Sequence, residues 1–208
     1  MKIEDYKNDN ERILWKGKPN KSVFISERIF TPLAIFAAIW LIFDIGFISV
    51  FLLQEGVMNG IGSFRYALIP FFILHLAPVW YYLGRIIFSV RSWKNTEYMV
   101  TDKAIYQTSG VFTTKCDRKT FQEVTNISIH QGIIDKTCDV GDIFIVTGKI
   151  RLSNGREKTE GINIIDIEDY VNVYKLINKT GSDVFSDTMY PNDLRPKENH
   201  GYNTEYKD

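Results

Sequence analysis

Two long apolar runs constrain the fold of this chain more than any other feature. They occupy residues 29–53 and 66–90, and residues 54–65 separate them. Each run is 25 residues long, whereas about 20 helical residues cross the hydrocarbon core of a bilayer, which is about 30 Å thick. Core helices of soluble proteins are rarely so long and so apolar. The two runs therefore predict a two-helix transmembrane hairpin over residues 29–90.

The rest of the chain is polar and charged. At 208 residues, it has room for a membrane element and one small domain. It carries 25 basic and 25 acidic side chains, so its net charge is zero. Because a general nucleic-acid binder needs an uncompensated basic surface, we expect no nucleic-acid partner.

Basic residues gather before the first apolar run and at the end of the second, on the side away from the connecting loop, and they predict the orientation of the hairpin. The loop between the runs carries one basic residue, Arg65. The positive-inside rule then places both termini in the cytoplasm and residues 54–65 outside, in a multi-pass protein of the cell membrane. No cleavable signal peptide is expected, because the first apolar run begins only at residue 29 and is too long. The basic side chains predicted at the membrane interface are Lys16, Lys18, Lys21, Arg28, Arg85, Arg91 and Lys94.

One ionisable residue in each run lies at the same predicted depth. Asp44 and His75 are each nine residues from the external end of their run. At about 1.5 Å per residue, antiparallel helices place both about 14 Å below the external surface. Because an unpaired carboxylate is costly in hydrocarbon, we expect an intramembrane polar pair. The pair can hold the helices together or line a proton or solute pathway in an oligomer; the alternatives are that the two side chains snorkel separately toward the lipid surface or pair between copies in an oligomer.

Aromatic residues at the end of the second run predict an inner aromatic belt, since amphipathic rings favour the headgroup level. Residues 1–28 are expected to form a cytoplasmic arm. Within this arm, Trp15 suits either the bilayer interface or a pocket on the cytoplasmic domain. The residues of the predicted belt are Trp80, Tyr81, Tyr82 and Trp93.

From Thr96 onward, the pattern changes to short segments rich in β-branched and aromatic residues, which is typical of antiparallel strands. Residues 132–139 are long enough for one helical turn between two of them. The predicted strands are residues 97–101, 104–108, 111–121, 124–130 and 142–147, followed by a hairpin of residues 149–152 and 158–164.

One amphipathic helix follows the strands. Asp166 is a good N-cap, and Gly181 can end the helix. Its apolar stripe must pack on the sheet. We therefore expect a cytoplasmic domain over residues 91–181 and a disordered polar tail over residues 182–208. The stripe consists of Ile167, Tyr170, Val171, Tyr174 and Ile177.

Antiparallel strands followed by one helix is the order of a pleckstrin-homology-like (PH-like) barrel. The specific residues are Tyr98-x-Val-Thr-Asp102, Gly110-Val-Phe, Val124-Thr-Asn-Ile-Ser-Ile-His-Gln-Gly132 and Val140-Gly141-Asp142. They resemble the PH domain of the bacterial and archaeal YdbS-like membrane proteins, in which a two-helix hairpin precedes the domain. The resemblance implies a prokaryotic protein with a small β-rich PH-like split barrel, capped by one C-terminal α-helix. Where that family often has Phe-Gly or Leu-Gly, this chain has Cys138-Asp139.

The sequence offers little material for catalysis. It contains no HExxH, CxxC, GxSxG, P-loop or GxGxxG pattern. Its three histidines, His75, His130 and His200, fall in different segments and predict no metal site. Cys116 with His130 lacks a third group to orient the pair. We expect no catalytic residue, no cofactor and no enzymatic activity, and the resemblance carries none over.

A basic group follows the third predicted strand. Lys115, Arg118 and Lys119 lie where a PH-like barrel can face phosphates. They either face a ligand in this way or form a solvated surface.

These observations predict a non-enzymatic integral membrane protein whose hairpin tethers a cytoplasmic PH-like binding module. Its partners are expected to be the lipid bilayer and a protein, either a different one or a second copy, bound at a groove or an edge strand. The alternatives are the pathway through Asp44 and His75, and sensing of anionic lipids by the basic interface residues.

Overall fold

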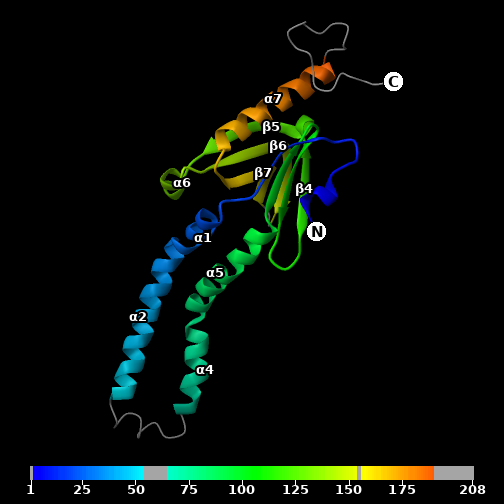
Figure 1. Cartoon of the computed structure of the whole chain (residues 1–208). Helices are drawn as coiled ribbons and strands as arrows, with labels where there is room; N and C mark the ends of the chain where they lie inside the picture. Colours follow the sequence, from blue (N-terminus) through cyan, green and yellow to red (C-terminus); the bar gives the residue numbers. More distant parts are fainter. Residues whose placement is uncertain (1, 54–64, 154–155, 190–208) are drawn as a thin grey trace. The chain divides into compact units, whose positions relative to one another are not determined.

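The computed structural model describes residues 2–53, 65–153 and 156–189 (Figure 1). Two compact units divide the chain. The first, which we call the β domain, combines Met1–Phe24 with Ser92–Asp208, and the second, the helical unit, is Ile25–Arg91. The helical unit is thus inserted into the chain of the β domain.

The β domain contains two antiparallel sheets. In both sheets, strands that are consecutive in the chain are neighbours in space. The four-stranded sheet consists of β1 (Ile13–Gly17), β2 (Glu97–Thr101), β3 (Ala104–Ser109) and β4 (Lys115–Thr120). The three-stranded sheet consists of β5 (Val124–His130), β6 (Gly141–Ser153) and β7 (Arg156–Ile167).

The helices divide between the two units. In the β domain they are η1 (Ile3–Tyr6), η3 (Phe121–Glu123), α6 (Ile133–Cys138) and α7 (Tyr170–Met189). The helical unit holds α2 (Pro32–Leu53), α4 (Arg65–His75) and most of α1 (Lys21–Ile29) and α5 (Ala77–Asn95).

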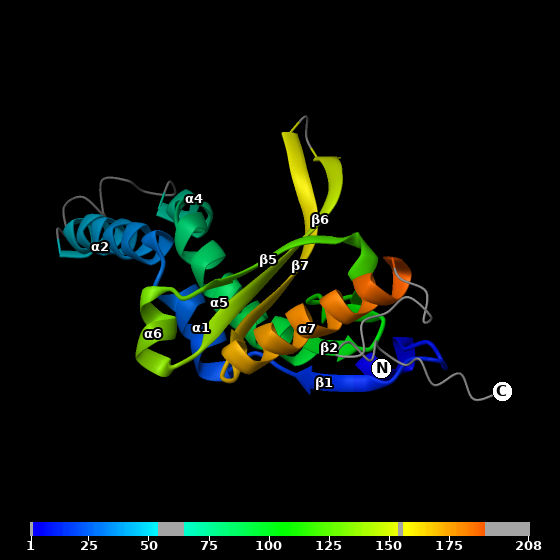
Figure 2. The ribbon, with the colours of Figure 1, turned by 90° about the horizontal axis from the view of Figure 1, so that it is seen from above.

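The predicted strands agree with the structure in part. β2 and β5 have the predicted bounds, and β3 is one residue longer. The prediction of a separate strand at 142–147 is wrong, because β6 continues through Ser153 and pairs with β7 in one long hairpin (Figure 2). A bulge between Val146 and Ile150 absorbs the change of register. Residues 154–155 of the predicted turn lie outside the described residues.

Helix α6 is the helical turn predicted between the fourth and fifth strands. It ends at Asp139, which has the left-handed backbone conformation with φ 54°. This is the position where the YdbS-like pattern has glycine. Because aspartate visits this conformation more readily than most residues, the turn forms without the glycine.

Helix α7 differs from its prediction at both ends. Asp166 belongs to β7 and does not cap the helix, which begins at Tyr170. The helix also continues through Gly181 to Met189, so the predicted tail begins too early. Residues 190–208 lie outside the described part of the chain.

The predicted stripe agrees with the structure at Ile167, Tyr170, Tyr174 and Ile177, which join or pack against the main core, and the buried face of α7 differs in having Val173 in place of Val171. Val173 and Ile177 are 2% and 0% exposed, whereas Val171 is 40% exposed. Val173 and Ile177 join the main core, which the inner faces of both sheets complete. The core therefore lies between the two sheets and α7.

A second, smaller core covers the other face of β2 and β3. It consists of Ile3, Met99, Ala104 and Tyr106. Ile3 comes from η1, so the N-terminal residues pack on the outer face of the sheet. As a result, β2 and β3 are buried on both faces, as their nearly continuous burial shows.

Residues 1–28 are not the separate arm that the sequence predicts. β1 pairs with β2, and Gly17 lies opposite Tyr98. Trp15 packs against the main core. Of the two predicted environments of Trp15, the structure shows the one on the domain. The arm belongs to the β domain because β2 offers it a strand to pair with.

The helical unit contains two antiparallel helical columns, α2 and α4–α5 (Figure 1). Within the first apolar run, Ile29 ends α1 and the long helix α2 begins at Pro32, a residue suited to the first turn of a helix. The second run is divided at Leu76, just before Pro78, which has no N–H to donate.

Among the described residues, one helical segment is long and apolar enough to cross a membrane by length and composition. This segment is Pro32–Val50 of α2, and only 11% of its apolar window is buried. The second run forms two shorter helices, so the structure itself does not show a two-span hairpin.

Candidate functional site

The β domain has a groove between β5 and α7. Within the described residues, β5 has one neighbouring strand, β6, so its other edge carries main-chain groups that no strand pairs. Helix α7 contacts both η3 and β5 beside this edge. The groove encloses about 880 Å³, a volume within the range of known ligand sites.

The groove has an uncharged lining. Its walls are formed by aliphatic, aromatic, hydroxyl and amide side chains, without a lysine, arginine, aspartate or glutamate. Phe185 of α7 is 61% exposed at the groove. Residues that β5 and α7 contribute include Thr125, Asn126, Ile127, Tyr174, Asn178 and Ser182. This chemistry suits an extended segment without charge better than a phosphate.

The short helix η3 contributes Phe121 and Gln122 to the groove lining and is held by Glu123. The Glu123 carboxylate accepts a hydrogen bond from the Thr120 N–H (3.0 Å) and forms an ion pair with Lys149. The hydrogen bond from Lys149, followed by that from Thr120, lowers the pKa of Glu123 to about 2. These contacts fix Phe121, which lines the groove and joins the main core.

The structure brings together Asp44 and His75. Oδ1 of Asp44 lies 2.8 Å from Nδ1 of His75. The His75 ring stacks with both Trp40 and Phe71, with ring centroids 4.9 and 5.2 Å away. Trp40 also donates from Nε1 to the carbonyl of His75 (2.8 Å). The pair thus sits at a contact between α2 and α4.

The basic group Lys115, Arg118 and Lys119 is not the ligand-facing cluster that the sequence allows. Successive strand residues alternate between faces, so Arg118 lies on the opposite face from the two lysines. Each cation is also paired with a carboxylate. The pairs are Lys115–Asp117 (2.8 Å), Arg118–Glu11 (2.8 Å) and Lys119–Glu160 (2.7 Å).

Three of the basic residues predicted at the membrane interface, Lys16, Lys18 and Lys21, contact other side chains within the β domain. Lys18 forms an ion pair with Glu97 (2.8 Å), and Lys16 pairs with Glu4 (2.5 Å). Lys18 and Lys21 lie over the ring of Trp93. These three lysines therefore have partners other than lipid, and the structure gives no support to a lipid-sensing rim. The remaining members lie on α1 and α5; they are Arg28, Arg85, Arg91 and Lys94.

The aromatic belt residues do not share one environment. Trp80 and Tyr81 are 53% and 65% exposed. Tyr82 donates to the carbonyl of Ile29 (3.1 Å) inside the helical unit. Trp93 belongs to the β domain and donates to the carbonyl of Pro19 (2.8 Å).

The sequence does not reveal the buried network around Glu11. This carboxylate accepts hydrogen bonds from the hydroxyls of Thr101 (2.7 Å) and Tyr106 (3.0 Å) and from Arg118 (2.8 Å). Burial acts to raise the pKa of Glu11, but the bonds from Thr101, Arg118 and Tyr106 outweigh burial and lower it. Asn8 donates the fourth bond (2.9 Å). No local pattern marks Glu11, because three of its four partners, Thr101, Tyr106 and Arg118, are 90 to 107 residues away in the chain.

Comparison with protein families gives one match, to the bacterial PH domain, over residues 42–180. No curated protein and no solved structure matches the chain significantly. The family match covers more than half of the sequence. It includes every described strand after β1, and it also includes most of α7. Together with the two sheets and the C-terminal helix, it shows that the chain belongs to the bacterial PH domain family.

Proposed function

We propose that this protein is a non-enzymatic membrane protein whose helical unit tethers the PH-like domain, and that the domain binds a protein segment in the groove between β5 and α7. The observation that carries the binding role is the open edge of β5 beside an uncharged groove. The membrane role rests on the apolar helix α2 and on the place where the helical unit is inserted.

The insertion point supports two membrane crossings, as in YdbS-like proteins. The helical unit leaves the β domain after β1 and returns before β2, and these two strands are hydrogen-bonded neighbours. Both strands must therefore lie on the same side of a membrane. If α2 crosses the bilayer, the chain has to cross back before β2, and α4–α5 is the apolar segment available for this.

The orientation rests on the basic residues that flank the apolar runs. Cys138 is exposed, whereas Cys116 is half-buried, so Cys138 is the better reporter. In a Cys116→Ser background, a membrane-impermeant thiol reagent should label Cys138 only after sealed cells are opened. A cysteine placed in the loop by Ser63→Cys, with Cys138→Ser, should be labelled in intact cells. Labelling of Cys138 from outside would overturn the orientation.

The groove favours an extended and uncharged segment of a partner protein. Main-chain groups on the open edge of β5 can add a strand, and pockets between β5 and α7 can select side chains. A charged segment would lose its hydration without gaining a counter-charge from the lining. Restriction of both proteins to one membrane raises their effective concentration, so a weak contact suffices.

The groove can be tested by crosslinking in intact membranes. A photoreactive residue at Asn126, which is exposed on β5, should crosslink to a short uncharged segment of a second membrane-associated protein. Phe185→Glu should abolish the crosslink, because it places a charge in the groove. Ile133→Glu is a matched control, since Ile133 is 89% exposed on α6 and does not line the groove.

Three outcomes would contradict this assignment. Crosslinking that is equal in both variants would show that the captured protein does not occupy the groove. Crosslinks only to a second copy of this chain would make the groove a self-association surface. Crosslinks only to lipid would place the face against the bilayer.

A second function is favoured by one observation, the contact of the buried Asp44 carboxylate with the partly exposed His75 ring. Oδ2 of Asp44 is buried and has no hydrogen-bond partner in the described part of the chain, so it can accept a further hydrogen bond from a water molecule or another copy. Because two helices cannot enclose a path, a pathway requires an oligomer. Proton flux in liposomes that is lost in Asp44→Asn and kept in Ser49→Ala would support this function, and no flux in the wild type would exclude it.

A further inference from the structure

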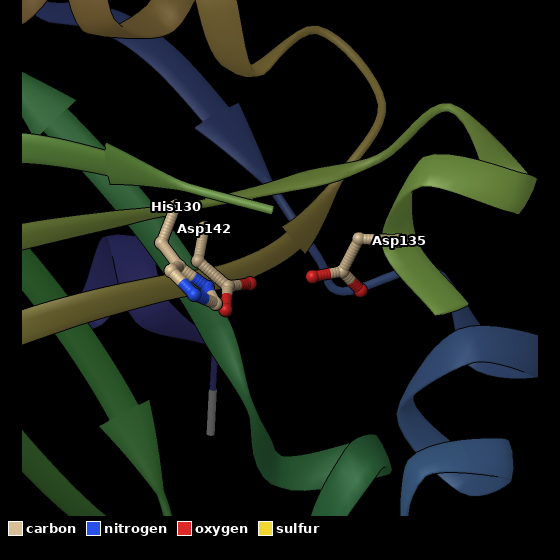
Figure 3. Close-up of side chains that lie close together, drawn as sticks. All are labelled: His130, Asp135 and Asp142. Carbon is tan, nitrogen blue, oxygen red and sulfur yellow. The ribbon is translucent and has the colours of Figure 1, made fainter. Parts of the chain in front are cut away.

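Three potential metal ligands converge at the opposite end of β5 from the groove. They are His130, the last residue of β5; Asp135 of α6; and Asp142, near the start of β6 (Figure 3). One ligand atom of each lies within 4.8 Å of those of the other two. The three residues come from successive elements of one β–α–β connection.

Strand pairing places two of the ligands on the same face. His130 is the register partner of Asp142 in the β5–β6 pair, so their side chains lie beside each other. Oδ1 of Asp142 accepts the N–H of Asp166 (2.9 Å), which orients the carboxylate. The His130 ring also makes an edge contact with Phe144, at 6.2 Å between centroids.

Asp135 supplies the observation that points to a ligand. Its side chain is 1% exposed, and Oδ2 accepts the N–H of Gly132 (2.7 Å). Oδ1 is buried and has no hydrogen-bond partner among the residues that the structure describes. Figure 3 shows the Asp135 carboxylate directed toward His130 and Asp142. A buried carboxylate oxygen without a partner is unfavourable, and a cation between the three groups would satisfy it.

We propose that His130, Asp135 and Asp142 bind a divalent transition-metal ion, for which Zn²⁺ is the best fit. One imidazole nitrogen and two carboxylate oxygens are a typical zinc ligand set, whereas Mg²⁺ and Ca²⁺ select oxygen ligands. Zinc–ligand bonds of about 2.0–2.2 Å in a tetrahedral site place the ligand atoms about 3.4 Å apart, so the three groups, which lie within 4.8 Å of one another, would have to move closer by at most about 1.4 Å. Three protein ligands leave the fourth position of the ion open for water or a partner group.

The ion would join the end of β5, α6 and the start of β6. Its charge would offset the proximity of several carboxylates, since an oxygen of Asp166 also lies within 4.8 Å of one of Asp135. Binding should therefore stabilise this end of the domain, because only the folded chain brings the three ligands together. The site is separate from the groove and does not depend on the proposed binding role.

The full chain in detergent, carrying a tag without histidines and stripped with EDTA, provides the test. Zn²⁺ titrated by calorimetry should bind at one ion per chain and raise the Tm, while an equal concentration of Mg²⁺ should not compete. His130→Gln and Asp142→Asn should each weaken Zn²⁺ binding at least tenfold. Asp139→Asn, which makes the same charge change on an exposed neighbour, and His200→Gln should leave the affinity unchanged.

The proposal fails if the wild type takes up no Zn²⁺, or if the ligand and control variants bind it alike. Asp135→Asn can unfold the chain because Asp135 is buried. In that case the zinc affinity of His130→Gln tests the proposal, because His130 is exposed and its replacement should leave the fold in place. Circular dichroism checks that this variant is folded.

Discussion

Arg118 of β4 forms an ion pair of 2.8 Å with Glu11, a residue 107 positions earlier in the chain. The Glu11 side chain is 1% exposed, whereas that of Arg118 is 37% exposed. Glu11 lies just before β1, so the pair connects the N-terminal segment to the far strand of the four-stranded sheet. The pair therefore fixes the N-terminal segment, which contains η1 and β1 and precedes the helical unit in the chain, to the β domain.

Removal of Arg118 should destabilise the β domain. Arg118→Leu leaves the Glu11 carboxylate buried without its cation, and we expect a loss of about 2–3 kcal/mol, less than for a fully buried pair because Arg118 is partly exposed. Denaturant unfolding measures the change. Lys115→Leu is the control, because its pair with Asp117 is exposed, and it should cost less than about 0.5 kcal/mol. Equal losses in both variants would mean that the pair has no structural role.

Glu11 should also make the domain sensitive to acid. Its pKa is lowered on folding from the ordinary value of 4.5, so its contribution is fully present above that pH and is lost as the pH falls through the lower, folded value. The free energy of unfolding, measured from pH 7 to pH 3, should therefore decline in the wild type. Glu11→Gln should be less stable at pH 7 but should lose less on acidification. Parallel pH curves would argue against this assignment.

The contact of Asp44 with His75 predicts coupling between the two positions. Asp44→Asn and His75→Gln should each destabilise the helical unit by about 1 kcal/mol, because each leaves a polar partner in an apolar contact. The double variant should cost less than the sum, as unfolding of the detergent-solubilised chain can measure. Simple additivity would show that the two side chains do not interact in the folded protein.

The insertion of the helical unit predicts which fragment folds. Residues 92–208 alone lack β1, η1 and the Glu11 network, so they should aggregate or remain unfolded. Joining Phe24 to Ser92 through a flexible linker of about eight Gly and Ser residues should give a folded and water-soluble domain, because both junctions belong to the β domain. Circular dichroism and gel filtration would distinguish the two chains. Equal folding of the shorter fragment would contradict a structural role for the N-terminal segment.

Replacement of Gly181 distinguishes a helix α7 that continues through this residue, as in the structure, from a helix that ends there. Inside a helix, Gly181→Ala should stabilise the domain by about 0.5–1 kcal/mol, and the added methyl group meets only Phe121 at 3.6 Å. If Gly181 ended the helix in a left-handed conformation, alanine would destabilise it instead. Gly161→Ala is the opposite control, because its Cβ would lie 2.2 Å from the carbonyl oxygen of Ile145. A rise in Tm for Gly181→Ala with a fall for Gly161→Ala is the expected result.

Local patterns predict much of the fold. The strands β2 and β5 and the turn α6 follow from side-chain type and spacing over a few residues, and they have nearly their predicted positions. The contact of Asp44 with His75 also follows from sequence, because helix geometry converts a residue count into a depth. The stripe on α7 was predicted less well, since Val171 and Val173 are equally apolar and only the position of the sheet decides which is buried.

The sequence by itself determined that an apolar helical segment accompanies a β-rich domain with one C-terminal helix, because periodicity and hydropathy act over short distances. Only the tertiary structure decided that β1 and η1 complete that domain, that Arg118 serves Glu11 rather than a ligand, and that His130 meets Asp135 and Asp142. These contacts join residues far apart in the chain or depend on strand register. Their partners are selected by the packed sheets, which no local pattern encodes.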